Sequence, residues 1–169
     1  MIIRPEKPDD YAAIRQVNQA AFAAHPYSKQ TEHLIVDALR AAQALSVSLV
    51  AEIDGQVVGH IAFSPAKIED EESHWSLLGP VAVLPPFQRR GIGRQLIEQG
   101  LAAIRTLGAH GCVLVGEPDF YCRFGFRHNP ALVMEGIPPE NFLNFLCLPI
   151  TDDGVRGRVS HHPAFLVSA

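Results

Sequence analysis

The chain has 169 residues, 47% of them apolar and 19% charged, with a formal net charge of −4. These values are typical of one soluble globular domain, and no apolar run reaches the roughly 18 residues that a membrane-spanning helix needs. The N-terminus lacks the apolar stretch of a signal peptide, and the three cysteines form no CxxC pair. We therefore expect a single domain over residues 1–169 that resides in the cytoplasm and has no membrane partner.

The first half of the sequence predicts a short strand, two helices and a hairpin. Residues 2–4 are the strand, residues 8–10 open the first helix, and the second helix covers about 31–42. The hairpin joins strands at 46–53 and 56–65 through Asp54-Gly55, because this dipeptide tolerates the positive φ angles of a tight turn. Residues 68–74 are expected to form an acidic connection.

The second half predicts one long helix among shorter strands. We expect a strand at 75–84, the long helix at 90–107 with its end at Gly108, a buried strand at 112–115, a helical turn at 119–124, and final strands at 126–134 and 141–148. The chain contains no repeats and no linker. Strands and helices mixed in this way indicate an α+β fold with a mixed sheet flanked by helices.

The segment PPFQRRGIGRQL, residues 85–96, places arginines and glycines at the predicted start of the long helix. It has neither the third glycine of a dinucleotide motif nor the Gly-Lys-Ser/Thr of a phosphate-binding loop. The free N–H groups and dipole of a helix N-terminus attract anions, and glycines let the backbone approach them closely. The segment therefore predicts a small-anion site, although a solvated helix start remains an alternative. The arginines form no broad basic face, which argues against a nucleic-acid partner.

The strand before this turn indicates what kind of anion it holds. Proline cannot donate to a strand ladder and glycine weakens one, so Gly79 and Pro80 predict a bulge where the strand parts from a neighbour. The predicted slot lies beside the predicted anion site. A ligand with a diphosphate and an extended, amide-bearing arm would occupy both, and acyl-CoA has that shape.

Two motifs give the sequence a family resemblance. VAV at 81–83 with QRRGIG at 88–93 resembles the acyl-CoA signature, Q/R-x-x-G-x-G/A, of the GNAT superfamily of N-acetyltransferases, and YCRFGF at 121–126 resembles its Tyr-x-x-x-Gly-Phe landmark. With GHIAFSP at 59–65, the sequence is most similar to the YhbS-like branch. The resemblance covers roughly residues 1–130. The less recognisable residues 131–169 correspond to an end that often shapes the acceptor pocket in the family.

The resemblance implies a splayed mixed sheet that binds acetyl-CoA, the acyl donor, between its fourth and fifth strands. The implied activity is direct transfer of acetyl to a primary amine in a ternary complex, and the alternative is an acyl-CoA-binding sensor or scaffold without turnover. The identity of the amine and a homodimeric state stay open. The residues that the resemblance assigns to the cofactor are Val81, Ala82, Val83, Gln88, Arg89, Arg90, Gly91, Ile92, Gly93 and Arg94.

Acetyl transfer needs a neutral amine, a donor for the oxyanion and a proton for the leaving thiolate. Tyr121 resembles the family's general acid, and its alternative is a buried ring with a hydrogen-bonded hydroxyl. Glu117 is a candidate base or a helix cap, and His60 is a weaker candidate because a histidine in mid-strand is more often structural. Cys122 is expected to be a small buried side chain rather than a nucleophile. The cysteines and histidines lack metal-ligand spacing, so we expect no metal.

Overall fold

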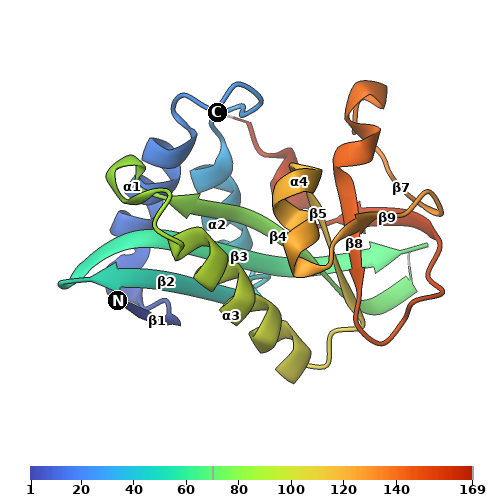
Figure 1. Ribbon diagram of the computed structural model, residues 1–169, viewed down its shortest axis with the longest axis horizontal. Helices are drawn as coiled ribbons and strands as arrows, with labels where there is room; N and C mark the ends of the chain where they lie inside the picture. The colour runs from blue at the N-terminus through green and yellow to red at the C-terminus, as the bar shows by residue number, and fades with distance from the viewer. Residues whose placement is uncertain (70, 169) are drawn as a thin grey trace.

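The computed structural model describes residues 1–69 and 71–168, and of the side chains of residues 71–73 nothing is described (Figure 1). The strands within it are β1 (Ile2–Pro5), β2 (Val47–Ile53), β3 (Gln56–Ile68), β4 (Glu71–Val83), β5 (Gly111–Val115), β6 (Arg127–His128), β7 (Leu132–Met134), β8 (Phe145–Pro149) and β9 (Gly157–His161). The α-helices are α1 (Tyr11–Phe22), α2 (Glu32–Ala41), α3 (Ile92–Thr106) and α4 (Pro118–Tyr121). The short 3-10 helices are η1 (Pro8–Asp10), η2 (Pro85–Phe87), η3 (Cys122–Phe124), η4 (Pro139–Asn144) and η5 (Pro163–Leu166).

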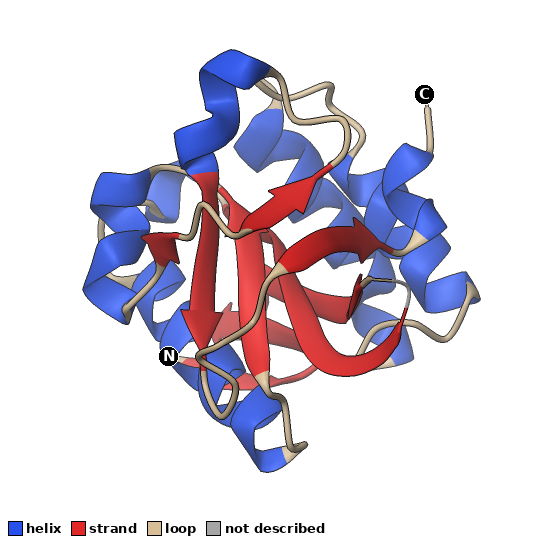
Figure 2. Cartoon of the chain, turned by 90° about the vertical axis from the view of Figure 1, so that its right-hand side faces the viewer, coloured by secondary structure: helices blue, strands red, loops and turns tan. Residues whose placement is uncertain are grey.

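The strands form one mixed sheet with helices on both faces. Their spatial order is β1-β2-β3-β4-β5-β8-β6, and β9 joins the far end of β3 and pairs with β7. Only the pairs β4–β5 and β7–β9 are parallel among the described strands. Figure 2 shows this sheet curving between the helices. The α+β fold with a mixed, helix-flanked sheet is thus confirmed.

The β2–β3 hairpin organises the N-terminal half. Asp54 (φ 50°) and Gly55 (φ 79°) both adopt the left-handed conformation that the tight turn requires. On one face of the hairpin, Ile14 of α1 and Val36 of α2 form a small buried cluster with Val50. The other face is covered by α3, which packs on β2, β3 and β4 (Figure 1).

The acidic connection predicted at 68–74 is wrong over most of its length. Residue Ile68 still belongs to β3 and pairs with Glu71, where β4 already begins. Asp70 lies outside the described residues. The end of β3 is paired on both edges, because its other edge pairs with β9, where Ile68 lies opposite Val159. A backbone ladder on two sides outweighs the low strand preference of acidic residues, because strand propensity depends strongly on tertiary context.

The C-terminal prediction also needs correction. The strand expected at 126–134 is two short strands, because Asn129 forms a turn in which its side-chain Oδ1 accepts from the N–H of Ala131 at 2.9 Å. The strand expected from residue 141 begins only at Phe145, since η4 precedes it. Strand β9 was not predicted.

The sheet splays between β4 and β5. Their parallel ladder covers Trp75–Leu77 against Gly111–Val113, three residue pairs. In the ladder with β3, Leu78 and Val81 are successive paired positions, so Gly79 and Pro80 bulge out at the point predicted from sequence. The remainder of β4 pairs with β3 alone, and the loop after it leads directly into α3.

Candidate active site

The last residues of β4 present backbone groups toward the opening of the sheet. The N–H of Leu84 donates to the carbonyl of Val58 in β3 at 2.8 Å. Leu84 is therefore at a hydrogen-bonded position, and such positions alternate with non-bonded ones along an antiparallel ladder. Val83 and Val81 are at non-bonded positions, so their N–H and C=O groups point away from β3. In agreement, the side-chain amide of Gln88 donates to the Val83 carbonyl at 2.9 Å. An extended amide-bearing ligand can therefore pair with this edge.

The turn after β4 ends in an exposed helix N-terminus. Gly91 (φ 82°) caps α3 without any side-chain cap, and the first helical bond runs from the N–H of Gln95 to the Gly91 carbonyl at 3.1 Å. The helix therefore begins at Ile92 rather than at Arg90 as predicted, because Gly91 is left-handed. A Cβ on Gly91 would meet nothing within 4 Å, and one on Gly93 only a Val83 methyl at 3.9 Å. Free N–H groups and open space are the features that an anion-binding turn requires.

The residues assigned to the cofactor differ in how far their side chains are exposed. Ala82 and Ile92 are buried, so these two can contribute only backbone groups to a ligand. The three arginines are exposed, but Arg94 bonds Glu98 at 2.8 Å and the Arg90 guanidinium lies 5.3 Å from the centre of the Phe87 ring. Arg89 has φ 62°, a left-handed conformation shared with Gly91, and alternation of this kind turns successive N–H groups toward one point.

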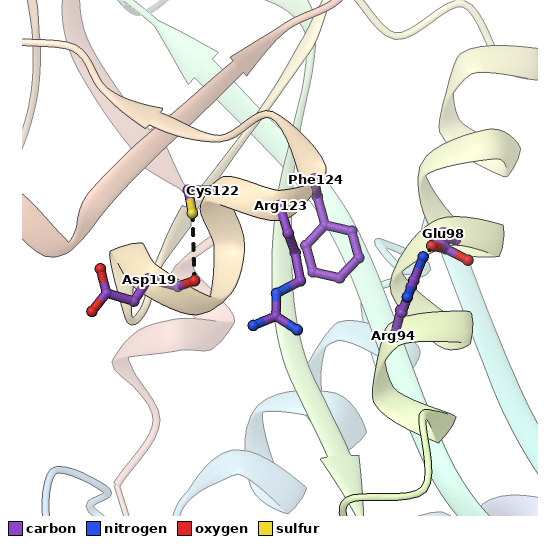
Figure 3. Close-up of a pocket in the computed structure, with 6 residues that line it drawn as sticks. All are labelled: Arg94, Glu98, Asp119, Cys122, Arg123 and Phe124. Atoms are coloured by element: carbon purple, nitrogen blue, oxygen red, sulfur yellow. Dashed lines mark hydrogen bonds and ion pairs between the residues drawn. The ribbon is translucent and has the colours of Figure 1, made fainter.

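A cleft of about 420 Å³ lies between α3 and the α4–η3 segment. Its lining residues are Arg94, Glu98, Asp119, Cys122, Arg123 and Phe124. Arg123 extends into the space between the two helices (Figure 3). The sequence motifs gave no role to Arg123, although this residue lies inside the YCRFGF landmark.

Cys122 is exposed, so the expectation of a buried side chain is wrong. Its thiol lies 3.4 Å from the carbonyl of Asp119, which it can donate to. Successive residues of a helical turn point about 100° apart, so the turn that directs Tyr121 inward directs the next residue toward the cleft.

Tyr121, the residue before Cys122, is packed in an aromatic cluster. Its ring centre lies 4.9 Å from that of Phe120 and 6.1 Å from that of the fully buried Phe126. Burial raises the pKa of Tyr121 to about 12, so the phenol keeps its proton at neutral pH. No residue of the described chain hydrogen-bonds the Tyr121 hydroxyl. The alternative of a buried ring with a hydrogen-bonded hydroxyl is therefore not what the structure shows.

Glu117 is exposed at the N-cap position that precedes α4, one turn before Tyr121. Its side chain makes no capping hydrogen bond, and only its backbone carbonyl accepts, from the N–H groups of Phe120 and Tyr121 at 3.1 Å each. The capping alternative is therefore not what the structure shows. The carboxylate is free to face a ligand.

His60 is fully buried on the face of the sheet opposite α3. The Asn18 amide donates to its Nδ1 at 3.2 Å, so the neutral ring carries its proton on Nε2, which lies 2.9 Å from Ser48 Oγ. Burial, with Arg40 nearby, lowers the pKa of His60 to about 4 although Glu6 opposes this shift. Both ring nitrogens are engaged inside the protein. This geometry favours the structural interpretation of His60 over the base role.

Comparison with known proteins places this geometry in a family. The Acetyltransferase (GNAT) domain model matches residues 44–128. The chain is 32% identical to the uncharacterized N-acetyltransferase YhbS of Escherichia coli K12, with 98% of each chain covered. The chain belongs to the GNAT acetyltransferase family. The predicted membership and the resemblance to the YhbS-like branch are confirmed.

Two solved GNAT structures extend this similarity to the C-terminal residues. An acetyltransferase from Brucella melitensis, crystallised with acetyl-CoA, is 51% identical with a TM-score of 0.86 over 97% of both chains. YhbS of Escherichia coli, crystallised with CoA, is 31% identical with a TM-score of 0.89 over 98% of this chain and 92% of that one. The structural similarity therefore also covers residues 131–169, where the sequence motifs were weak. In the described part of the chain, no helix is long and apolar enough to cross a membrane.

Proposed function

We propose that the protein is an N-acetyltransferase that transfers the acetyl group of acetyl-CoA directly to a primary amine. The observation that carries this proposal is the continuity between two features: the free edge of β4 at Val81 and Val83 leads into the open N-terminus of α3 at Gly91. Relatives of this GNAT chain solved with acetyl-CoA and with CoA support the choice of cofactor.

The proposed cofactor site uses mostly backbone groups. The pantetheine amides pair with Val81 and Val83, and the pyrophosphate accepts from the N–H groups at the start of α3. Arg89 and Arg90 add positive charge at the turn. The cleft between α3 and η3 continues this surface and offers Arg123 as a further cation for phosphate groups. Acetyl-CoA thus matches the proposed site both in its extended shape and in its negative charge.

The proposed chemistry is attack of the amine nitrogen on the thioester carbonyl carbon. A carbon–nitrogen bond forms, the tetrahedral oxyanion collapses, and the carbon–sulfur bond breaks with its electron pair on sulfur. Tyr121 donates its hydroxyl proton to that sulfur, a role suited to a phenol whose raised pKa keeps it protonated. The resulting phenolate takes up the second proton, which the nitrogen loses as the amide forms. The exposed Glu117 carboxylate accepts a proton from the ammonium, directly or through water. His60 has no part in the proposal.

A paired assay tests the proposal. Calorimetry measures the affinity for acetyl-CoA, and release of free CoA thiol is followed with a broad panel of amines and peptides. Binding with amine-dependent thiol release, and an acetylated product by mass spectrometry, are expected. Tight binding without release for any amine would instead identify a sensor or scaffold. Absence of binding at millimolar acetyl-CoA in a folded sample would contradict the cofactor assignment.

A further inference from the structure

The mouth of the β4–β5 opening carries exposed apolar side chains on the side away from α3. Along β5, Cys112 and Leu114 belong to the core cluster under α3, whereas Val113 belongs to the cluster on the opposite face. Alternation places the Val115 side chain on that opposite face too, where it is 53% exposed. The cofactor site proposed above occupies the α3 side. The amine must therefore arrive from the face that Val115 borders.

A second apolar segment is fixed beside Val115. The N–H of Gly116 donates to the carbonyl of Asn144 at 2.9 Å, and the Asn144 side-chain amide donates to the Gly116 carbonyl at 3.1 Å. These two bonds tie the end of η4 to the residue that precedes Glu117. Within η4, Phe142 is 52% exposed and Leu143 is 66% exposed.

The elements that carry this surface also carry exposed carboxylates. Residues 139–144 of η4 contain neither lysine nor arginine. Glu140 lies in η4 itself and is exposed, as is Glu117 at the start of α4. A partner of this surface should be cationic, and it gains most if it also has an apolar part to cover Phe142 and Leu143.

We propose that the acceptor is an amphiphilic monoamine, a primary ammonium attached to an alkyl or aryl body that packs on Val115, Phe142 and Leu143. This inference rests on the proposed function and names its substrate class. A polycation or a polyhydroxylated amine would leave the apolar side chains in contact with water and gain nothing from them. The carboxylates attract the ammonium, and the apolar surface selects among amines of equal charge.

A homologous series of amines tests the proposal. Ethylamine, butylamine and hexylamine have the same charge, so differences in kcat/KM report apolar contact. Burial of one methylene is worth about 0.8 kcal/mol, which corresponds to roughly fourfold in kcat/KM. We expect a rise of about two- to fourfold per methylene, and spermidine should be a poorer acceptor than hexylamine.

Variants assign the effect to η4. In the double variant Phe142→Ser/Leu143→Ser the dependence on chain length should largely disappear, while the affinity for acetyl-CoA stays within about twofold. Leu107→Ser is the matched control, because Leu107 is 64% exposed but lies at the far end of α3. The control should keep the full dependence. Since all three side chains are exposed, the variants should fold.

Three results would overturn the inference. A chain-length series with measurable turnover but no slope would show that the acceptor does not use this surface. A dimer that the double variant converts to a monomer, with unchanged acceptor preference, would assign the surface to a second copy of the chain. Binding of acetyl-CoA without turnover of any amine would remove the proposed function as well, which distinguishes the two failures.

Discussion

The ring of Tyr121 occupies the space in which residue 116 would carry a side chain. A Cβ built on Gly116 would lie 2.4 Å from Cε2 of Tyr121, closer than any real contact. The residue directly after β5 therefore sets how near the phenol can lie to the end of that strand. Because the proposed acid must reach the sulfur of the cofactor, its rate contribution depends on this close approach.

Replacement of Gly116 by alanine should move the Tyr121 ring. Because misplacement of a catalytic group by about 1 Å can cost up to 10²-fold, we expect kcat to fall at least tenfold while acetyl-CoA affinity stays within about twofold. Steady-state kinetics and calorimetry provide both quantities. Gly154→Ala is the control, since a Cβ there meets nothing within 4 Å. Equal kcat values for the two variants would show that the ring position does not matter.

Tyr121→Phe removes only the proposed proton donor. Acetyl-CoA should still bind, and turnover should fall by about 10²- to 10⁴-fold, the usual effect of a lost general acid. The pKa of about 12 also means that ionisation of Tyr121 should not lower the wild-type rate below about pH 11. If the variant keeps more than about a third of the parental turnover at every pH, solvent supplies the proton and Tyr121 is not the acid.

Gly93→Val should weaken cofactor binding. The added methyl groups enter the open space between α3 and Val83, where the Cβ itself would lie 3.9 Å from a Val83 methyl. We expect at least a tenfold loss of acetyl-CoA affinity by calorimetry. Gln99→Val is the matched control, because it introduces the same β-branched residue at an exposed position of α3 away from the turn. A loss no greater than in the control would place the phosphates elsewhere.

His60 predicts a pH dependence of stability. The folded protein binds a proton at His60 only near pH 4, whereas the unfolded chain does so near pH 6.5. Between these values the unfolded state holds more protons, so the free energy of unfolding should fall as the pH drops, by at most about 1.4 kcal/mol per pH unit. Urea unfolding at several pH values between 4 and 7 measures the slope. His60→Gln should flatten it, and parallel curves for the two proteins would contradict the assignment.

Local signals in the sequence predicted several parts of the fold, including those that form the proposed cofactor site. Asp54-Gly55 predicts its own turn because the backbone angles depend on two residues alone. Gly79 and Pro80 likewise predict the bulge, since one weakens a ladder and the other cannot donate to it. The turn before α3 was also predicted by local reasoning, with the start of the helix placed two residues early, and its anion-binding role stays a prediction.

Features that depend on distant partners could not be predicted. Strand β9 exists because Val159 pairs with Ile68 and β7, and nothing near residue 159 signals that pairing. The surroundings of His60 come from other elements that contribute Asn18 and Ser48, so the sequence could suggest a structural histidine but not its partners. The neighbourhood of η4 and Gly116 is equally non-local.

The three residue pairs that join β4 to β5 have a consequence for how the chain holds together without a ligand. Within the described residues no position of β4 beyond Leu77 pairs with β5, so the backbone amides of Val81 and Val83 are open to solvent exchange. A bound pantetheine arm would act as a substitute strand and close that gap. With the cofactor bound, these two amides should exchange only when the ligand leaves or when a larger part of the sheet opens. Slowed hydrogen exchange at Val81 and Val83 would therefore show that the substrate itself completes the sheet.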